Sequence, residues 1–145
     1  MPDLPDPDTV PCSPFDETGG LAYFPRMLAK IRLHAAGRLW ADLHANLGKG
    51  MDLWCCGYLQ VTYDEVKEQV LKGATDDEVL RWCEQRGQPL NDITRHVWRQ
   101  FLHKVGMNDA ASGRLAKWKA ESGLADRDDI VTMGHYMDVA EGRKP

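Results

Sequence analysis

The sequence GLAYFPRMLAKIRLHAAGR, residues 20–38, sets the architecture that we expect for the whole chain. Its apolar side chains recur at spacings of three and four, which is the period of one face of an α-helix. Pro25 falls near the first turn, where its missing N–H costs little, and Gly37 suits the C-terminal end. We therefore predict an amphipathic helix here, against which the other helices pack. Its apolar face spans an arc of about 80° and comprises Leu21, Phe24, Leu28, Ile31 and Ala35.

Two further helices are predicted from matching N-terminal motifs. Thr62–Glu65 and Thr75–Glu78 each place a threonine three residues before a glutamate, which is the capping-box pattern. Residues 51–59, MDLWCCGYL, are apolar nearly all round and predict a short buried helix, while residues 40–47 form a short amphipathic piece. No segment alternates between apolar and polar residues for long enough to predict a strand.

The last third of the chain predicts three more helices. Asn91 is the expected N-cap of a helix that runs to Val105, and Asn108 or Asp109 opens another that runs to Ser122. Asp126 is expected to open the final helix. The side chains that we expect to face inward are Ile93, Val97, Phe101 and Val105 in the first, Leu115 and Trp118 in the second, and Ile130, Met133, Met137 and Ala140 in the third.

These patterns predict an all-α fold, a compact single-domain bundle of six to eight short helices. Residues 1–18 contain five prolines and no helical period, so we expect an extended N-terminal arm there. Gly19-Gly20 gives a flexible entry to the first helix, and residues 19–145 form a single helical domain.

Composition excludes several classes of protein. A chain of 145 residues with 43% hydrophobic and 28% charged residues is typical of a globular domain. No apolar run reaches the ~18–20 residues that a membrane span needs, and the N-terminus does not resemble a signal peptide. We therefore expect a cytoplasmic protein without membrane contact, in which the four cysteines stay as free thiols.

Charge is distributed unevenly along the chain. Residues 20–50 hold five bases and one acid, a net charge of +4, which leaves −8 for the remainder of a chain whose total is −4. An acidic protein binds nucleic acid poorly, because contacts with phosphates dominate that affinity, so no nucleic-acid partner is expected. A local positive patch is suited to a small anion.

Several residues of this basic segment are candidates for anion binding. Arg26, Lys30 and His34 form a row at spacings of four, roughly opposite the apolar arc, and ordinary surface cations give the same pattern. Arg32 lies at the margin of that arc, where a guanidinium needs a carboxylate, a carbonyl or a ligand as partner. The predicted ligand-binding set is Tyr23, Arg26, Lys30, Arg32, Lys49 and Trp54.

Thiol chemistry is the weaker alternative. Cys55 and Cys56 point about 100° apart on a helix, so they do not share a metal easily, and small buried hydrophobic residues fit the pattern as well. As a nucleophile, either cysteine needs a histidine that lowers its thiol pKa, and His34 or His44 is the candidate. The spacing of the histidines predicts no metal site, and no motif predicts a cofactor.

Several separated motifs resemble one family. The chain is similar to the bacterial domain-of-unknown-function family numbered 5069 over essentially its whole length. That family often has an acid at the position of Ala29 and a base at the position of Phe15, so this chain departs from the pattern there. The resemblance implies a single-domain cytoplasmic protein and implies no reaction. The motifs that carry it are Ser13-Pro14, Gly19-Gly20, Pro25–Leu28, Lys30–Arg32, Asn46–Gly50, Cys55-Cys56, Lys119–Ile130 and Glu141–Arg143.

We therefore expect binding of a small anionic ligand at a basic pocket beside the helix of residues 20–38. One alternative is a protein-interaction or homo-oligomeric module without catalysis, which would use exposed tryptophans among Trp40, Trp98 and Trp118. The other is a small enzyme that uses a Cys/His pair.

Overall fold

The computed structural model describes residues 3–145 and confirms the predicted, mostly α-helical fold. The described part of the chain forms seven α-helices, two short 3₁₀ helices and one two-stranded sheet. In chain order the elements are η1 (Pro7–Thr9), β1 (Glu17–Thr18), β2 (Leu21–Ala22), α1 (Phe24–Ala35), η2 (Ala41–Asn46), α2 (Met51–Leu59), α3 (Tyr63–Leu71), α4 (Asp76–Arg86), α5 (Asp92–Lys104), α6 (Ser112–Glu121) and α7 (Met133–Ala140).

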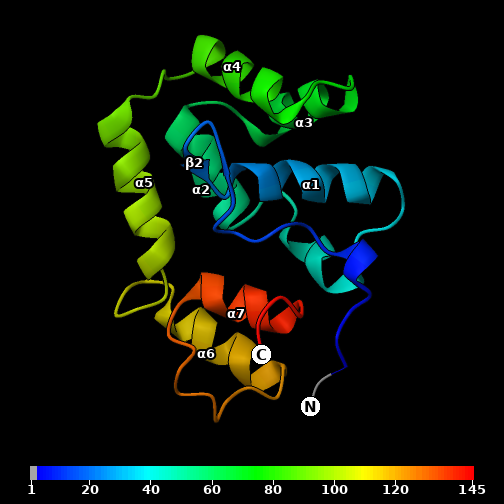
Figure 1. Cartoon of the computed structure of the whole chain (residues 1–145), viewed down its shortest axis with the longest axis vertical. Helices are drawn as coiled ribbons and strands as arrows, with labels where there is room; N and C mark the ends of the chain where they lie inside the picture. Colours follow the sequence, from blue (N-terminus) through cyan, green and yellow to red (C-terminus); the bar gives the residue numbers. More distant parts are fainter. Residues whose placement is uncertain (1–2) are drawn as a thin grey trace.

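Helix α1 lies across the middle of the molecule. In Figure 1, α3 and α4 lie on one side of α1, and α6 and α7 lie on the other. Helix α5 runs along one edge and connects these two groups. Because neighbours cover α1 on more than one side, its burial extends well beyond the predicted apolar arc.

The entry to α1 differs from the prediction. Gly19 and Gly20 have φ angles of +54° and +79° and form the tight turn of a hairpin, in which β1 and β2 pair antiparallel. A two-residue hairpin turn that matches the right-handed twist of its strands often requires positive φ at both central residues, and glycine adopts that conformation without strain. The helix therefore begins at Phe24, and Leu21 is buried in the second strand.

The caps that the sequence predicted are confirmed for three helices. Thr62 and Thr75 each accept a hydrogen bond from the backbone N–H three residues on, and the glutamate there bonds back. Asn91 caps α5 in the same reciprocal way. The final helix begins later than expected, since Thr132 is its N-cap and the residues after Asp126 form turns.

The buried face of α5 is also different from the predicted stripe. Ile93 and Val97 are 70% and 53% exposed, whereas Trp98 and Leu102 are 4% and 1% exposed. Trp98 is fixed in place because its indole N–H donates to the carbonyl of Ala22, 2.7 Å away, in the hairpin. The prediction is wrong for Ile93 and Val97, whereas Val105 is buried as expected and Phe101 packs against the core. Trp98 is not an exposed tryptophan.

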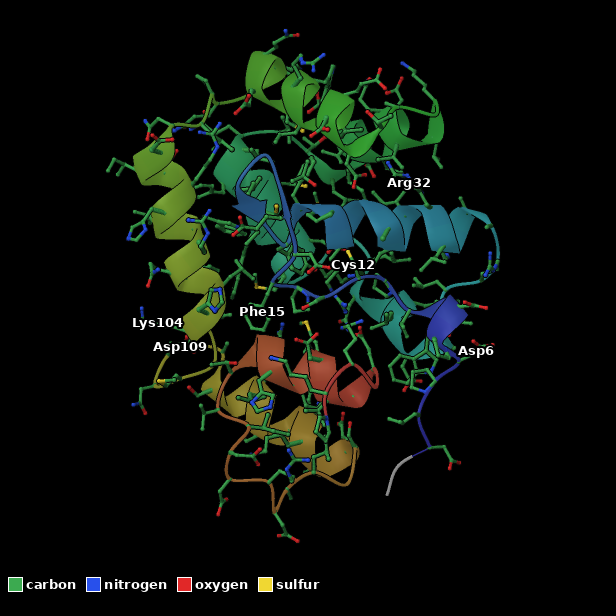
Figure 2. All side chains as sticks on the ribbon, in the orientation of Figure 1. Asp6, Cys12, Phe15, Arg32, Lys104 and Asp109 are labelled. Atoms are coloured by element: carbon green, nitrogen blue, oxygen red, sulfur yellow. The ribbon has the colours of Figure 1, made fainter. Side chains whose placement is uncertain are left out.

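The N-terminal arm packs onto the helices. Phe15 stacks on His103, with ring centroids 4.6 Å apart, and Figure 2 shows it between the end of α5 and α7. Near the C-terminus, Arg143 donates to the carbonyl of Pro11 at 2.7 Å. No helix within residues 3–145 is both long enough and apolar enough to cross a membrane.

Candidate functional site

A pocket of about 480 Å³ lies on the side of α1 that faces α6 and α7, and we call it the central pocket. It is bounded by the start of α1, the segment from η2 to α2, and helices α6 and α7. Aromatic and sulfur-containing side chains make up much of its wall: Trp40, Trp54, Trp118, Met133, Tyr136 and Met137. Apolar walls with a few polar groups are typical of small-molecule sites.

Asp52 organises one end of the central pocket. This carboxylate is fully buried and accepts hydrogen bonds from the Tyr23 hydroxyl at 2.5 Å, from Lys30 Nζ at 3.0 Å and from the backbone N–H of Gly48 at 3.0 Å. Tyr23 and Lys30 both line the pocket and are 1% and 3% exposed. One carboxylate therefore joins the start of α1 to the loop that precedes α2.

The backbone and electrostatics of this cluster are unusual. Tyr23 has a φ of 73°, a left-handed conformation that is strained for a bulky residue. Burial lowers the pKa of Lys30, Asp52 opposes that shift, and the neighbouring Arg26 adds to it. Burial, together with the charge of Asp52, holds the pKa of the Tyr23 hydroxyl well above its usual value. Strained backbone and perturbed ionisation both occur more often at functional sites than elsewhere.

A second buried ion pair lies beside the first. Arg26 makes two parallel hydrogen bonds to Glu141, of 2.7 and 2.6 Å, and a third to the carbonyl of Cys12 at 3.0 Å. Burial opposes the charge of Arg26, but the bonds to Glu141 outweigh it and raise the guanidinium pKa. Arg143 also donates to Glu141 and to Asp138, so the C-terminal end of the chain helps to neutralise this cluster.

Two cations at the mouth of the central pocket have no such partner. Lys49 and Arg114 line the pocket and are exposed, and neither side chain forms an ion pair or hydrogen bond within residues 3–145. The guanidinium of Arg114 lies over the loop, because a Cβ added at Gly50 would come within 3.8 Å of its Nη1. Arg114 of α6 and Lys49 of the loop before α2 therefore line the same pocket, as do the exposed acids Asp42 and Glu121.

The structure brings together five of the six residues predicted to bind a ligand. Tyr23, Arg26, Lys30, Lys49 and Trp54 line the central pocket, and Arg32 does not. Arg26 and Lys30, which the helical wheel placed away from the core, are buried as ion pairs, because α1 is covered on that side as well.

Arg32 has an internal partner. Its guanidinium bonds to Asp76 at 2.6 Å and to the carbonyl of Ala74 at 3.1 Å, on the side of α1 that faces α4 (Figure 2). With side-chain exposures of 41% and 34%, this is a surface ion pair at the acidic start of α4. The sequence left open whether Arg32 binds a carboxylate or a ligand, and the structure assigns it to the carboxylate.

The thiols and imidazoles that were the weak catalytic candidates are not brought together. Cys55 and Cys56 are each 1% exposed, and burial raises the pKa of Cys56 to about 12 and that of Cys55 well above its usual value. His34 and His44 are exposed and contact each other edge to face, with centroids 5.2 Å apart. Neither thiol bonds to an imidazole in the described chain, so nothing there favours a thiolate.

Other residues of the site were missed from the sequence. Asp52 is the one charged residue of the apolar stretch 51–59, and that isolation was a usable signal. Glu141 and Arg114 belong to ordinary polar surroundings in the sequence, so only the fold shows their position at the pocket. Among residues 3–145, no three His, Cys, Asp or Glu side chains are grouped in a way that could hold a metal ion.

Fold and pocket together define a compact, mostly α-helical protein with an aromatic-walled cavity beside two buried ion pairs. The chain belongs to the family described as Domain of unknown function (DUF5069), which matches residues 8–143. No curated protein matches the chain.

Proposed function

We propose that the protein binds a small anionic ligand with an apolar or aromatic body in the central pocket. The observation that carries this proposal is the position of Lys49 and Arg114, two cations without a protein carboxylate at the mouth of an apolar cavity. An anion between them would gain charge-assisted hydrogen bonds, and its apolar part would replace water against Trp54 and Trp118.

Arg26 and Lys30 have a different part in this proposal from the one that the sequence predicted. Glu141 already neutralises Arg26, and Asp52 neutralises Lys30, so these two cations form a fixed polar part of the pocket wall. The negative charge of the ligand is balanced by Lys49 and Arg114. Arg32, on another face of α1, has no part in it. The four free thiols support the expected cytoplasmic location, since that compartment keeps cysteines reduced.

Thermal unfolding with a panel of anions tests the proposal. Inorganic phosphate, phenyl phosphate, phenylpropionate and the uncharged phenylpropanol are suitable probes. We expect the aromatic anions to raise the melting temperature more than phosphate or phenylpropanol does, because a ligand that binds only the folded state stabilises it.

Matched variants locate the binding site. Arg114→Ala should weaken affinity by about tenfold, the equivalent of ~1.4 kcal/mol, because one charged contact is lost. Lys117→Ala is the control, since Lys117 lies on the same helix, is 73% exposed and does not line the pocket. If both variants respond to the anions as the wild type does, or if no anion stabilises the wild type, the proposal is wrong.

Self-association is a second candidate function, and one observation favours it. Ile93, Val97 and Leu53 are more than half exposed on α5 and α2, where the bundle leaves large apolar side chains in contact with water. A second copy of the chain is the partner that this alternative specifies. Light scattering tests it: a dimer that Val97→Asp converts to a monomer supports it, and a monomeric wild type excludes it.

A further inference from the structure

Lys30 has a setting that a structural ion pair does not require. Lys30 lines the central pocket and is 3% exposed, and within residues 3–145 its Nζ donates to Asp52 alone, at 3.0 Å. An ammonium has three N–H groups, so two remain for whatever occupies the pocket. A buried ion pair between such groups gains little stability over apolar side chains of the same size.

The surroundings of Lys30 lower its pKa, although the charge of Asp52 opposes that shift. Burial and the positive charge of Arg26 lower its pKa, and Asp52 is close enough to accept the proton directly. Tyr23 donates to the other oxygen of Asp52 and is held there by its left-handed backbone. Desolvation and a second cation nearby are the two means by which proteins make a lysine amine nucleophilic.

The amine also lies near the proposed anion contacts. Lys30 Nζ and the backbone N–H of Gly48 bond to the same oxygen of Asp52, each at 3.0 Å, so the two nitrogens are at most twice that distance apart. Lys49 is the next residue of that loop, and Arg114 lies over Gly50. Lys30, Lys49 and Arg114 all line the central pocket, so one ligand can contact the amine and both cations.

We propose that Lys30 forms an imine with the carbonyl group of an α-keto acid bound in the central pocket. This inference rests on the proposed function, since Lys49 and Arg114 hold the carboxylate of the same ligand. It narrows the ligand class from anions in general to carboxylates with a neighbouring ketone or aldehyde.

The step balances with the groups present. Lys30 gives one proton to Asp52, and the neutral amine attacks the carbonyl carbon, forming a C–N bond while the π electrons move to oxygen. That oxygen takes up the proton held by Asp52. The amine nitrogen then loses a second proton to Asp52, which protonates the hydroxyl so that the C–O bond breaks and water leaves. The product is a protonated imine with the same total charge as the starting ammonium, and no oxidant or reductant is used.

Reductive trapping tests this inference. The full chain is incubated with phenylpyruvate and cyanoborohydride, which reduces an imine to a stable secondary amine, and the adducts are located by peptide mass mapping. We expect Lys30 to be labelled at least about tenfold more than the exposed Lys117, although exposure alone predicts the reverse order. Phenylpropionate, which has the carboxylate and ring without the carbonyl, should protect Lys30.

Two further readouts separate this inference from the proposed function. Lys30→Arg keeps the positive charge beside Asp52 and cannot form an imine, so it should lose the adduct while phenylpropionate still raises its melting temperature. If this variant does not fold, protection of wild-type Lys30 by phenylpropionate against labelling shows whether the amine lies in the anion site. Stabilisation by phenylpropionate without labelling of Lys30 overturns the imine and leaves the anion site standing. Labelling in proportion to exposure, with no stabilisation, overturns both.

Discussion

Single residues explain where the polar groups of this protein lie. Asp52 stands in an otherwise apolar helix, and its carboxylate is shared by a phenol, an ammonium and a backbone N–H. Arg32, which the sequence marked as unusual, is an ordinary surface partner of Asp76. A charge inside an apolar run is thus a better sign of a buried network than a charge at the margin of an amphipathic face.

Asp52→Asn is expected to destabilise the fold strongly. The amide cannot balance the buried charge of Lys30, and removing one member of a buried ion pair typically costs about 3–5 kcal/mol. The measurement is the free energy of unfolding in urea at neutral pH. Asp42→Asn is the control, because Asp42 also lines the pocket but is exposed and forms no ion pair within residues 3–145. Its effect should stay within about 0.5 kcal/mol. Equal losses in the two variants would show that Lys30 does not depend on Asp52.

At the scale of elements, the N-terminal arm contacts α7 closely at Phe15. Gly134 lies in the first turn of α7, and a Cβ added there would come within 2.3 Å of the Phe15 ring. Gly113 occupies the same position in the first turn of α6, and a Cβ added there would meet nothing within 4 Å. A larger side chain is therefore excluded at Gly134 by Phe15, whereas the structure leaves space for one at Gly113.

Alanine at these two positions should act in opposite directions. Gly113→Ala is expected to stabilise the protein by about 0.5 kcal/mol, because alanine loses less backbone entropy in a helix. Gly134→Ala should destabilise it by about 1–3 kcal/mol, since Phe15 must move out of its contact with His103. Urea denaturation of both variants checks the signs. A stabilised Gly134→Ala variant would mean that Phe15 does not pack on α7 in solution.

The same scale shows what local sequence predicts well. Capping boxes at Thr62 and Thr75 depend on side chains three residues apart, and both were predicted correctly. The Gly19-Gly20 turn was expected to be flexible, because a two-residue strand carries no detectable alternation. Ile93 and Val97 of α5 were wrongly expected to face inward, because Trp98 is held by the carbonyl of Ala22, a contact between segments far apart in the chain.

For the whole molecule, the sequence predicted the fold class and five of the residues that line the pocket, for different reasons. Helix periods and caps are local, so the all-α fold follows from them. The pocket residues from α1 and the Lys49 loop were found because they cluster in the sequence. Arg114 and Glu141 come from helices that reach the pocket only after folding, and no local pattern connects them with Lys30 or Lys49.

The whole molecule also determines how stability responds to alkaline pH. Burial raises the pKa of Cys56 and of Cys83 to about 12, and those of Cys55 and Tyr23 well above their usual values. The unfolded chain releases these protons at lower pH than the folded chain does. Stability is therefore complete below the ordinary thiol pKa of 9.0 and falls as the pH rises toward 12. The lowered pKa of Lys30 has the opposite effect on stability, but the groups with raised pKa values outnumber it.

Cys56→Val tests this linkage, because valine fills a similar volume and carries no titratable group. Between pH 9.5 and 10.5, the free energy of unfolding of the wild type should fall more steeply than that of the variant, by up to about 1.4 kcal/mol per pH unit. Urea denaturation with a reductant present measures both slopes, and values at pH 7 serve as the control for any change in packing. Parallel slopes would mean that the Cys56 thiol ionises as easily in the folded protein as in the unfolded chain. That result would contradict its position between α1 and α2, where its sulfur lies 3.6 Å from that of Met27.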